Sequence, residues 1–111
     1  MGIQVSNVCI DTNDLKRATD FWQAATGFSV ASADESTVYF EASDKGGAAI
    51  SLQLVPEQRQ GKNRLHVDFS TSDLDGEVKR LKDLGATEVQ AYDGWVVLKD
   101  LDGNEFCVCA A

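Results

Sequence analysis

The chain has 111 residues, of which 43% are hydrophobic and 25% charged, and these proportions fit one folded domain with a modest core. Its formal charge of −8 argues against nucleic acid and anionic membranes as partners, because Lys and Arg are outnumbered and form no run. No apolar run is long enough to span a bilayer and the start resembles no secretory signal, so we expect a cytoplasmic protein. The cysteines are odd in number and lack zinc-type spacing, which indicates free thiols.

The first half of the chain predicts a strand, a helix and three further strands. Apolar and polar residues alternate over residues 6–11, as in a strand with one packed face. The side-chain oxygens of residues 12–14 suit a helix N-cap, and apolar residues then recur at helical spacing until Gly27 ends the helix. Further strands are expected over residues 28–31, 37–42 and 48–55, the last two joined by a turn over 44–47.

A polar linker over residues 57–63 precedes a second copy of this pattern. Residues 65–71 alternate like the first strand and hold the only histidine, His66, which aligns with Asn7 of the first copy. A helix capped by Ser72 or Asp73 and ended near Gly85 should follow. The remaining strands are expected over residues 87–91, 95–99 and 105–110, with turns at 92–94 and 100–104.

We therefore predict one α+β domain over residues 1–111, built as an internal βαβββ duplication. Module one covers about residues 3–56 and module two about 64–111. Each helix should cover one face of its sheet, with Ile50, Leu52 and Leu54 facing the first helix. If the sheets lie side by side and curve, their polar faces form one concave cleft, lined by Asn7, Cys9, Asp11, Ser51, Gln53, His66, Asp68, Ser70, Glu105, Cys107 and Cys109, with Trp95 and Tyr92 as walls.

The order and spacing of several loose motifs resemble the glyoxalase, bleomycin-resistance and extradiol dioxygenase superfamily, also called vicinal oxygen chelate proteins. The resemblance covers the whole chain and is strongest to small glyoxalase-like domains of unassigned function. Its motifs are Asp14-Leu15-Lys16-Arg17-Ala18, Phe21-Trp22, Gly27-Phe28, Leu65-His66-Val67-Asp68, Asp73-Leu74, Leu84-Gly85-Ala86 and Asp100-Leu101-Asp102-Gly103-Asn104. It implies paired βαβββ modules around a concave sheet, and in many members a divalent metal.

The resemblance places the metal ligands on the first and last strands of each module. His66 matches a ligand histidine, whereas Asn7 stands where relatives have histidine or glutamine and is a poorer ligand. Gln53 or Ser51 stands at the fourth-strand position, and Cys107 replaces the usual glutamate. We expect no metal, because magnesium, manganese and iron(II) prefer more carboxylates or imidazoles, and zinc more His and Cys. If one binds, its predicted ligands are His66, Gln53 and Glu105.

Four residues have competing interpretations. His66 is expected to act in the cleft, as a hydrogen-bonding residue or general base, rather than as a metal ligand. Glu105 is either a general acid or base with a raised pKa, or a rim carboxylate. Asp68 and His66 should point in parallel, since residues two apart on a strand do so. Cys107 is a nucleophile if His66 lies across the sheet from it, and otherwise an inert buried thiol.

The favoured function is binding of a small organic ligand between the modules without the usual divalent metal. The alternatives are a metal-dependent lyase, isomerase or dioxygenase of the same superfamily, with His66 and Glu105 catalytic, and a drug-binding resistance protein. The ligand contacts predicted for the favoured function are Asn7, Cys9, Ser51, Gln53, His66, Asp68, Trp95 and Cys107. The linker permits the modules to close within one chain or to swap between two chains of a homodimer.

Overall fold

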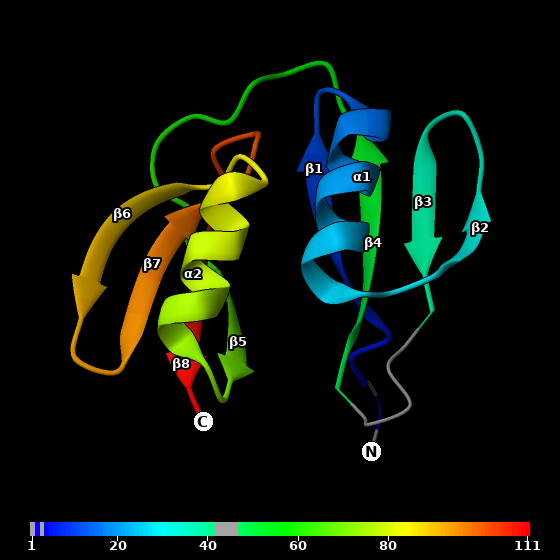
Figure 1. The fold of residues 1–111 in the computed structure, drawn as a ribbon. Helices are drawn as coiled ribbons and strands as arrows, with labels where there is room; N and C mark the ends of the chain where they lie inside the picture. Colours follow the sequence, from blue (N-terminus) through cyan, green and yellow to red (C-terminus); the bar gives the residue numbers. More distant parts are fainter. Residues whose placement is uncertain (1, 3, 42–46) are drawn as a thin grey trace. The chain divides into compact units, whose positions relative to one another are not determined.

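The computed structural model describes residues 2, 4–41 and 47–111. The chain divides into two compact units, Met1–Gln58 and Arg59–Ala111, here called unit 1 and unit 2. Each unit contains one helix and a four-stranded mixed sheet in the order βαβββ (Figure 1). The predicted α+β fold of two tandem βαβββ modules is therefore confirmed. Among the residues described, no helix is long and apolar enough to cross a membrane.

Unit 1 contains β1 (Asn7–Thr12), α1 (Leu15–Thr26), β2 (Val30–Ala33), β3 (Thr37–Phe40) and β4 (Ala49–Leu54). The sheet order is β1-β4-β3-β2, with β1 parallel to β4 and the other pairs antiparallel. The predicted turn over 44–47 and the predicted end of its preceding strand at Ala42 fall largely outside the described residues.

Helix α1 begins and ends where local chemistry predicts. The Asp14 side chain caps it by accepting a hydrogen bond from Arg17 N at 3.1 Å. Gly27 ends it in the left-handed conformation at φ 76°, which a residue without Cβ adopts at little cost. Phe21 and Trp22 are each 3% exposed and meet edge to face, so both belong to the core.

The β4 strand contributes to this core only in part. Ile50 and Leu52 are buried, as expected from their alternation. Leu54 was predicted to face the helix with them, but its side chain is 41% exposed. It is the last residue of β4, so the expectation fails at the end of the strand.

Unit 2 contains β5 (Val67–Thr71), α2 (Leu74–Asp83), β6 (Thr87–Tyr92), β7 (Trp95–Lys99) and β8 (Glu105–Ala110). The sheet order β5-β8-β7-β6 repeats that of unit 1, and β5 runs parallel to β8. Asp73 caps α2 by accepting from Gly76 N at 3.1 Å. The core is formed by one face of the sheet and the facing side of α2, and includes Val78, Leu81, Val96, Leu98, Phe106 and Val108.

The start of β5 differs from the prediction. The strand begins at Val67 rather than at Leu65, because pairing with β8 starts at Val67 and Phe106. Leu65 is 87% exposed instead of packing against the core. His66 consequently lies in the segment before the strand, outside the alternation that orients strand side chains.

Candidate functional site

In unit 1, the strand register gathers the predicted polar residues on the sheet face opposite the core. Cys9 pairs with Ser51, and Asp11 with Gln53, along the parallel β1–β4 ladder. Ser51 is only 2% exposed and donates a hydrogen bond to Asn7 Oδ1 at 3.0 Å. The Cys9 thiol donates a weaker bond to Gln53 Oε1 at 3.9 Å. These groups partly satisfy one another, and the side chains of Cys9 and Gln53 remain exposed.

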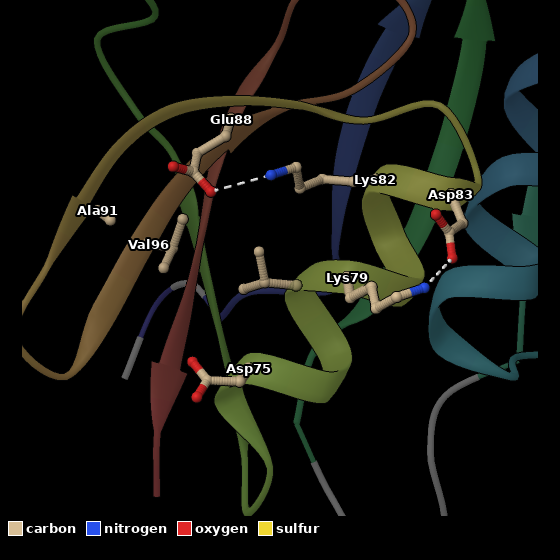
Figure 2. Close-up of a pocket in the computed structure, with 8 residues that line it drawn as sticks. Asp75, Lys79, Lys82, Asp83, Glu88, Ala91 and Val96 are labelled. Carbon is tan, nitrogen blue, oxygen red and sulfur yellow. Dashed lines mark hydrogen bonds and ion pairs between the residues drawn. The ribbon is translucent and has the colours of Figure 1, made fainter.

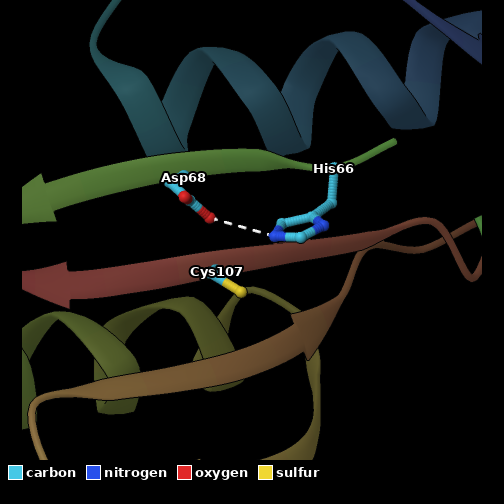
Figure 3. A group of neighbouring side chains, drawn as sticks. All are labelled: His66, Asp68 and Cys107. Carbon is cyan, nitrogen blue, oxygen red and sulfur yellow. Dashed lines mark ion pairs between the residues drawn. The ribbon is translucent and has the colours of Figure 1, made fainter. Parts of the chain in front are cut away.

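In unit 2, three side chains that could each offer a ligand atom to a metal ion meet on the polar face (Figure 3). Asp68 on β5 and Cys107 on β8 are direct register partners. His66 turns toward them, and its Nε2 lies 3.2 Å from Asp68 Oδ1. One donor atom from each of the three residues lies within 4.8 Å of the other two. The expectation that His66 and Asp68 point in parallel is wrong, because His66 precedes the strand.

Cys107 is the buried member of this group, at 6% exposure. Burial raises the pKa of its thiol, and the charge of the nearby Asp68 carboxylate and a hydrogen bond to it raise that pKa further. A protonated thiol is a poor nucleophile. The site therefore favours the neutral thiol form, although an imidazole lies close by.

Glu105 lies on the same strand face but has other partners. Its carboxylate accepts hydrogen bonds from the Arg59 guanidinium and from Asn63 N, the latter at 3.0 Å. Burial by itself would raise the pKa of Glu105, but the hydrogen bonds from Asn63 and Arg59 outweigh burial and lower it. The raised pKa expected of a general acid at Glu105 is therefore wrong.

Arg59 and Asn63 were not identified as functional residues from the sequence. They belong to the stretch predicted to be a featureless linker, and Arg59 Nε also donates to Asn63 Oδ1 at 3.2 Å. No hydrophobic pattern or motif distinguishes them. Their role is seen only in the folded structure, where residues 59–63 lie beside the start of β8 and Arg59 and Asn63 donate hydrogen bonds to the Glu105 carboxylate.

An aromatic pair lies on the same sheet face as Asp68 and Cys107. Trp95 on β7 pairs in register with Cys109, which shares the strand face of Cys107. The rings of Trp95 and Tyr92 stack with centroids 4.6 Å apart and planes 15° apart. Their side chains are 41% and 50% exposed, respectively. Tyr92 and Trp95 form an aromatic platform beside a polar group, which is a common arrangement in small-molecule sites.

A cavity of about 310 Å³ lies elsewhere in unit 2, between α2 and strands β6 and β7 (Figure 2). Its lining contains none of the predicted site residues and consists of Asp75, Val78, Lys79, Lys82, Asp83, Glu88, Ala91 and Val96. Both lysines form ion pairs within the lining, Lys79 with Asp83 at 3.0 Å and Lys82 with Glu88 at 3.4 Å. These cations are already neutralised, so the cavity offers no strong attraction for an anionic ligand.

The donors of unit 2 determine which metal would fit. Of the predicted set, Gln53 belongs to unit 1, and both carboxylate oxygens of Glu105 accept hydrogen bonds from other groups. The group that the structure brings together offers one imidazole, one thiol and one carboxylate. Magnesium and manganese prefer sites rich in oxygen ligands, and this set does not fit them. A mixed nitrogen, sulfur and oxygen set is of the kind that zinc binds.

Comparisons with known proteins agree with this architecture. The structure of a glyoxalase/bleomycin resistance protein/dioxygenase family enzyme from Burkholderia phytofirmans PsJN is similar, with a TM-score of 0.81, 19% identity, and coverage of 97% of this chain and 98% of that one. The fosfomycin resistance protein FosX from Listeria monocytogenes, complexed with Mn(II) and sulfate, has a TM-score of 0.83 at 19% identity and coverage of 100% and 92%.

FosX from Mesorhizobium loti has a TM-score of 0.81 at 18% identity, with coverage of 98% and 92%. No match was found among curated proteins. At these identities the structural similarity concerns the fold alone. A family model described as a glyoxalase-like domain, however, matches residues 7–109, almost the whole chain. This chain belongs to the glyoxalase-like domain family.

Proposed function

We propose that this protein binds a small aromatic ligand on the polar sheet face of unit 2, without a magnesium- or manganese-type ion. The observation that carries this proposal is that the Tyr92–Trp95 platform and the polar group of His66 and Asp68 share one face. Stacking on the exposed rings would hold the ligand body, and the polar group would set its orientation. That the ligand lies in a cleft between the modules stays a prediction from the sequence.

The charges on this face favour one class of ligand. The Asp68 and His66 side chains are 63% and 44% exposed, so both are open to a ligand. A carboxylate accepts hydrogen bonds and repels anions. The site should therefore prefer phenols, catechols and aryl amines over aryl carboxylates.

The unit 1 residues are proposed as further contacts to the ligand. Cys9 and Gln53 are exposed on the polar face and each keeps donor or acceptor capacity beyond their weak mutual bond. Ser51 is buried and bonded to Asn7, so we assign these two a supporting role in shaping that face. Cys107 is proposed to form the floor beneath Asp68.

Tryptophan fluorescence tests the proposal directly, because the chain has only two tryptophans. Trp22 is 3% exposed in the unit 1 core and Trp95 is 41% exposed on the platform. Titration with catechol, benzylamine and benzoate in the presence of EDTA should give saturable quenching by the first two and weaker quenching by benzoate. Trp95→Phe should abolish this quenching, since Trp22 is shielded.

A matched pair of variants isolates the carboxylate. Asp68→Asn should weaken benzylamine binding and reduce the discrimination against benzoate. Asp75→Asn makes the same charge change at an exposed position on α2 and should alter neither. Absence of saturable quenching, or equal effects of the two substitutions, would overturn the proposal.

A metal-dependent lyase, isomerase or dioxygenase of the same superfamily is the second candidate, and the manganese complex of the FosX relative favours it. In this candidate, His66 and Glu105 would be catalytic and Gln53 a third ligand. Tight, stoichiometric Mn²⁺ binding that His66→Ala removes, measured by electron paramagnetic resonance, would establish it over our proposal. The drug-binding alternative, the homodimer and the cytoplasmic location stay predictions.

A further inference from the structure

We propose that the cavity between α2 and strands β6 and β7 binds linear aliphatic amines, with the ammonium group on Asp75 and the methylene chain over the apolar bottom of the cavity. This inference goes beyond the proposed function, which concerns the opposite face of the same sheet. The cavity has a volume of about 310 Å³, within the range of small-molecule sites. All of its lining residues belong to unit 2.

The cavity exists because α2 does not cover the outer edge of the sheet. The helix packs against β8, whereas β6 is the last strand of the sheet and all six of its residues are exposed. The space between α2 and β6 is therefore left open on the helix side (Figure 2). A small molecule can enter it without any movement of the helix.

The bottom of the cavity is apolar. Val78 on α2 and Val96 on β7 are 8% and 7% exposed, and Ala91 on β6 is the register partner of Val96. The short side chain of Ala91 leaves room above the two valines. These three side chains can pack against methylene groups but offer no hydrogen bond, so the bottom favours a hydrocarbon chain.

The rim of the cavity favours a cation. It carries three carboxylates and two ammonium groups, so its net charge is negative. Lys79 is paired with Asp83 and Lys82 with Glu88. Asp75 forms no ion pair with any other residue that the structure describes, although Lys79 lies one helical turn away. An ammonium group on Asp75 would balance this charge, and the chain's formal charge of −8 attracts cations in general.

The two ends of the cavity are far enough apart for a linear ligand. Asp75 and Lys82 are separated by seven residues of α2, which is about 10 Å along the helix axis. Figure 2 shows Asp75 at one end of the cavity and the Lys82–Glu88 pair at the other, with Val96 between them. A ligand that places its ammonium group on Asp75 would therefore lay its chain along the valines.

Hexylamine is the probe for the experiment, and two-dimensional amide NMR of the full chain detects weak binding and locates it. Hexylamine should cause saturable shifts that centre on Val78, Ala91 and Val96. Propylamine should bind about tenfold more weakly, because its shorter chain buries fewer methylene groups. Hexanol lacks the charge and hexanoate reverses it, so both should also bind more weakly than hexylamine.

Two variants separate the charge from the apolar bottom. Asp75→Asn should weaken hexylamine binding by about threefold, as for loss of an exposed ion pair, and should remove the preference over hexanol. Asp20→Asn makes the same charge change on α1 of unit 1, at a side chain that is 63% exposed, and should leave binding unchanged. Ala91→Leu fills the cavity from an exposed strand and should abolish binding while the circular dichroism spectrum is retained.

Four results would overturn the inference. They are the absence of saturable shifts, shifts confined to residues outside the cavity, hexanoate binding as tight as hexylamine binding, and equal effects of Asp75→Asn and Asp20→Asn. Quenching of Trp95 reports the opposite sheet face and is measured separately. Failure of the cavity site therefore does not affect the proposed function, and failure of the proposed function leaves the cavity site intact.

Discussion

Replacing Arg59 with methionine should lower the free energy of unfolding by about 2 kcal/mol, because Glu105 then keeps its charge in a mostly buried place without a cationic partner. The Arg59 and Glu105 side chains are only 21% and 10% exposed. Breaking a fully buried ion pair costs roughly 3–5 kcal/mol, and an exposed pair contributes about 0–1 kcal/mol. The expected loss of stability lies between these limits, because Asn63 N still donates a hydrogen bond to the Glu105 carboxylate.

Urea denaturation of the full chain measures this change. A small protein has an m-value of about 1–3 kcal/mol/M, so the midpoint should fall by about 1 M. Lys79→Met is the matched control, since the Lys79–Asp83 pair of α2 is 79% and 67% exposed and should contribute about 0.5 kcal/mol or less.

A second variant separates the buried charge from lost packing. Arg59→Met combined with Glu105→Gln removes both charges and should recover part of the stability lost in Arg59→Met, because no unpaired carboxylate is left buried. If Arg59→Met is no more destabilising than Lys79→Met, or if the double variant recovers nothing, the ion pair does not anchor residues 59–63 as we infer.

Three further predictions concern the core, the helix ends and pH. Leu98→Ala should cost about 2–5 kcal/mol in urea denaturation, since Leu98 is 0% exposed on β7, and a cost below 1 kcal/mol would contradict its core position. Gly27→Ala should cost about 1 kcal/mol through its positive φ, and Gly85→Ala should lower the melting temperature at least as much, since Gly85 has φ 117° and the end of the Leu101 side chain would have to move away from the new Cβ. Burial raises the pKa of Asp100 despite hydrogen bonds from residues 102 and 104, so the folded state holds that proton more tightly than the unfolded chain. Stability should therefore fall as pH rises from about 4 through the raised pKa, and Asp100→Asn should flatten this part of the pH profile of unfolding.

Much of the secondary structure could be predicted from local patterns. The strands Trp95–Lys99 and Glu105–Ala110 have the predicted bounds, and Asp14 and Asp73 cap the helices from among the candidates named. Alternation and helical spacing are properties of a short stretch, so the sequence displays them directly. Repetition of the same pattern in the second half established the duplicated fold, because two stretches independently indicated one arrangement.

The composition of the candidate site could be predicted only in part. Alternation placed Asp68 and Cys107 on the polar face of unit 2, where the register has them, whereas the role of Trp95 and Tyr92 as walls of a ligand cleft stays a prediction. The approach of His66 to Asp68 could not be predicted, because it depends on where pairing with β8 begins. Leu65 was misplaced for the same reason.

The sequence by itself determined the helices and strands, their duplication and, within the strands, most of the residues that share a sheet face. Alternation and helical spacing depend only on residues that are close together in the chain. Tertiary structure decided which polar groups meet. Glu105 accepts hydrogen bonds from Arg59 and Asn63, and Cys107 lies beside Asp68 and His66. Both outcomes arise from contacts between segments far apart in the chain, whose register and burial no local pattern specifies.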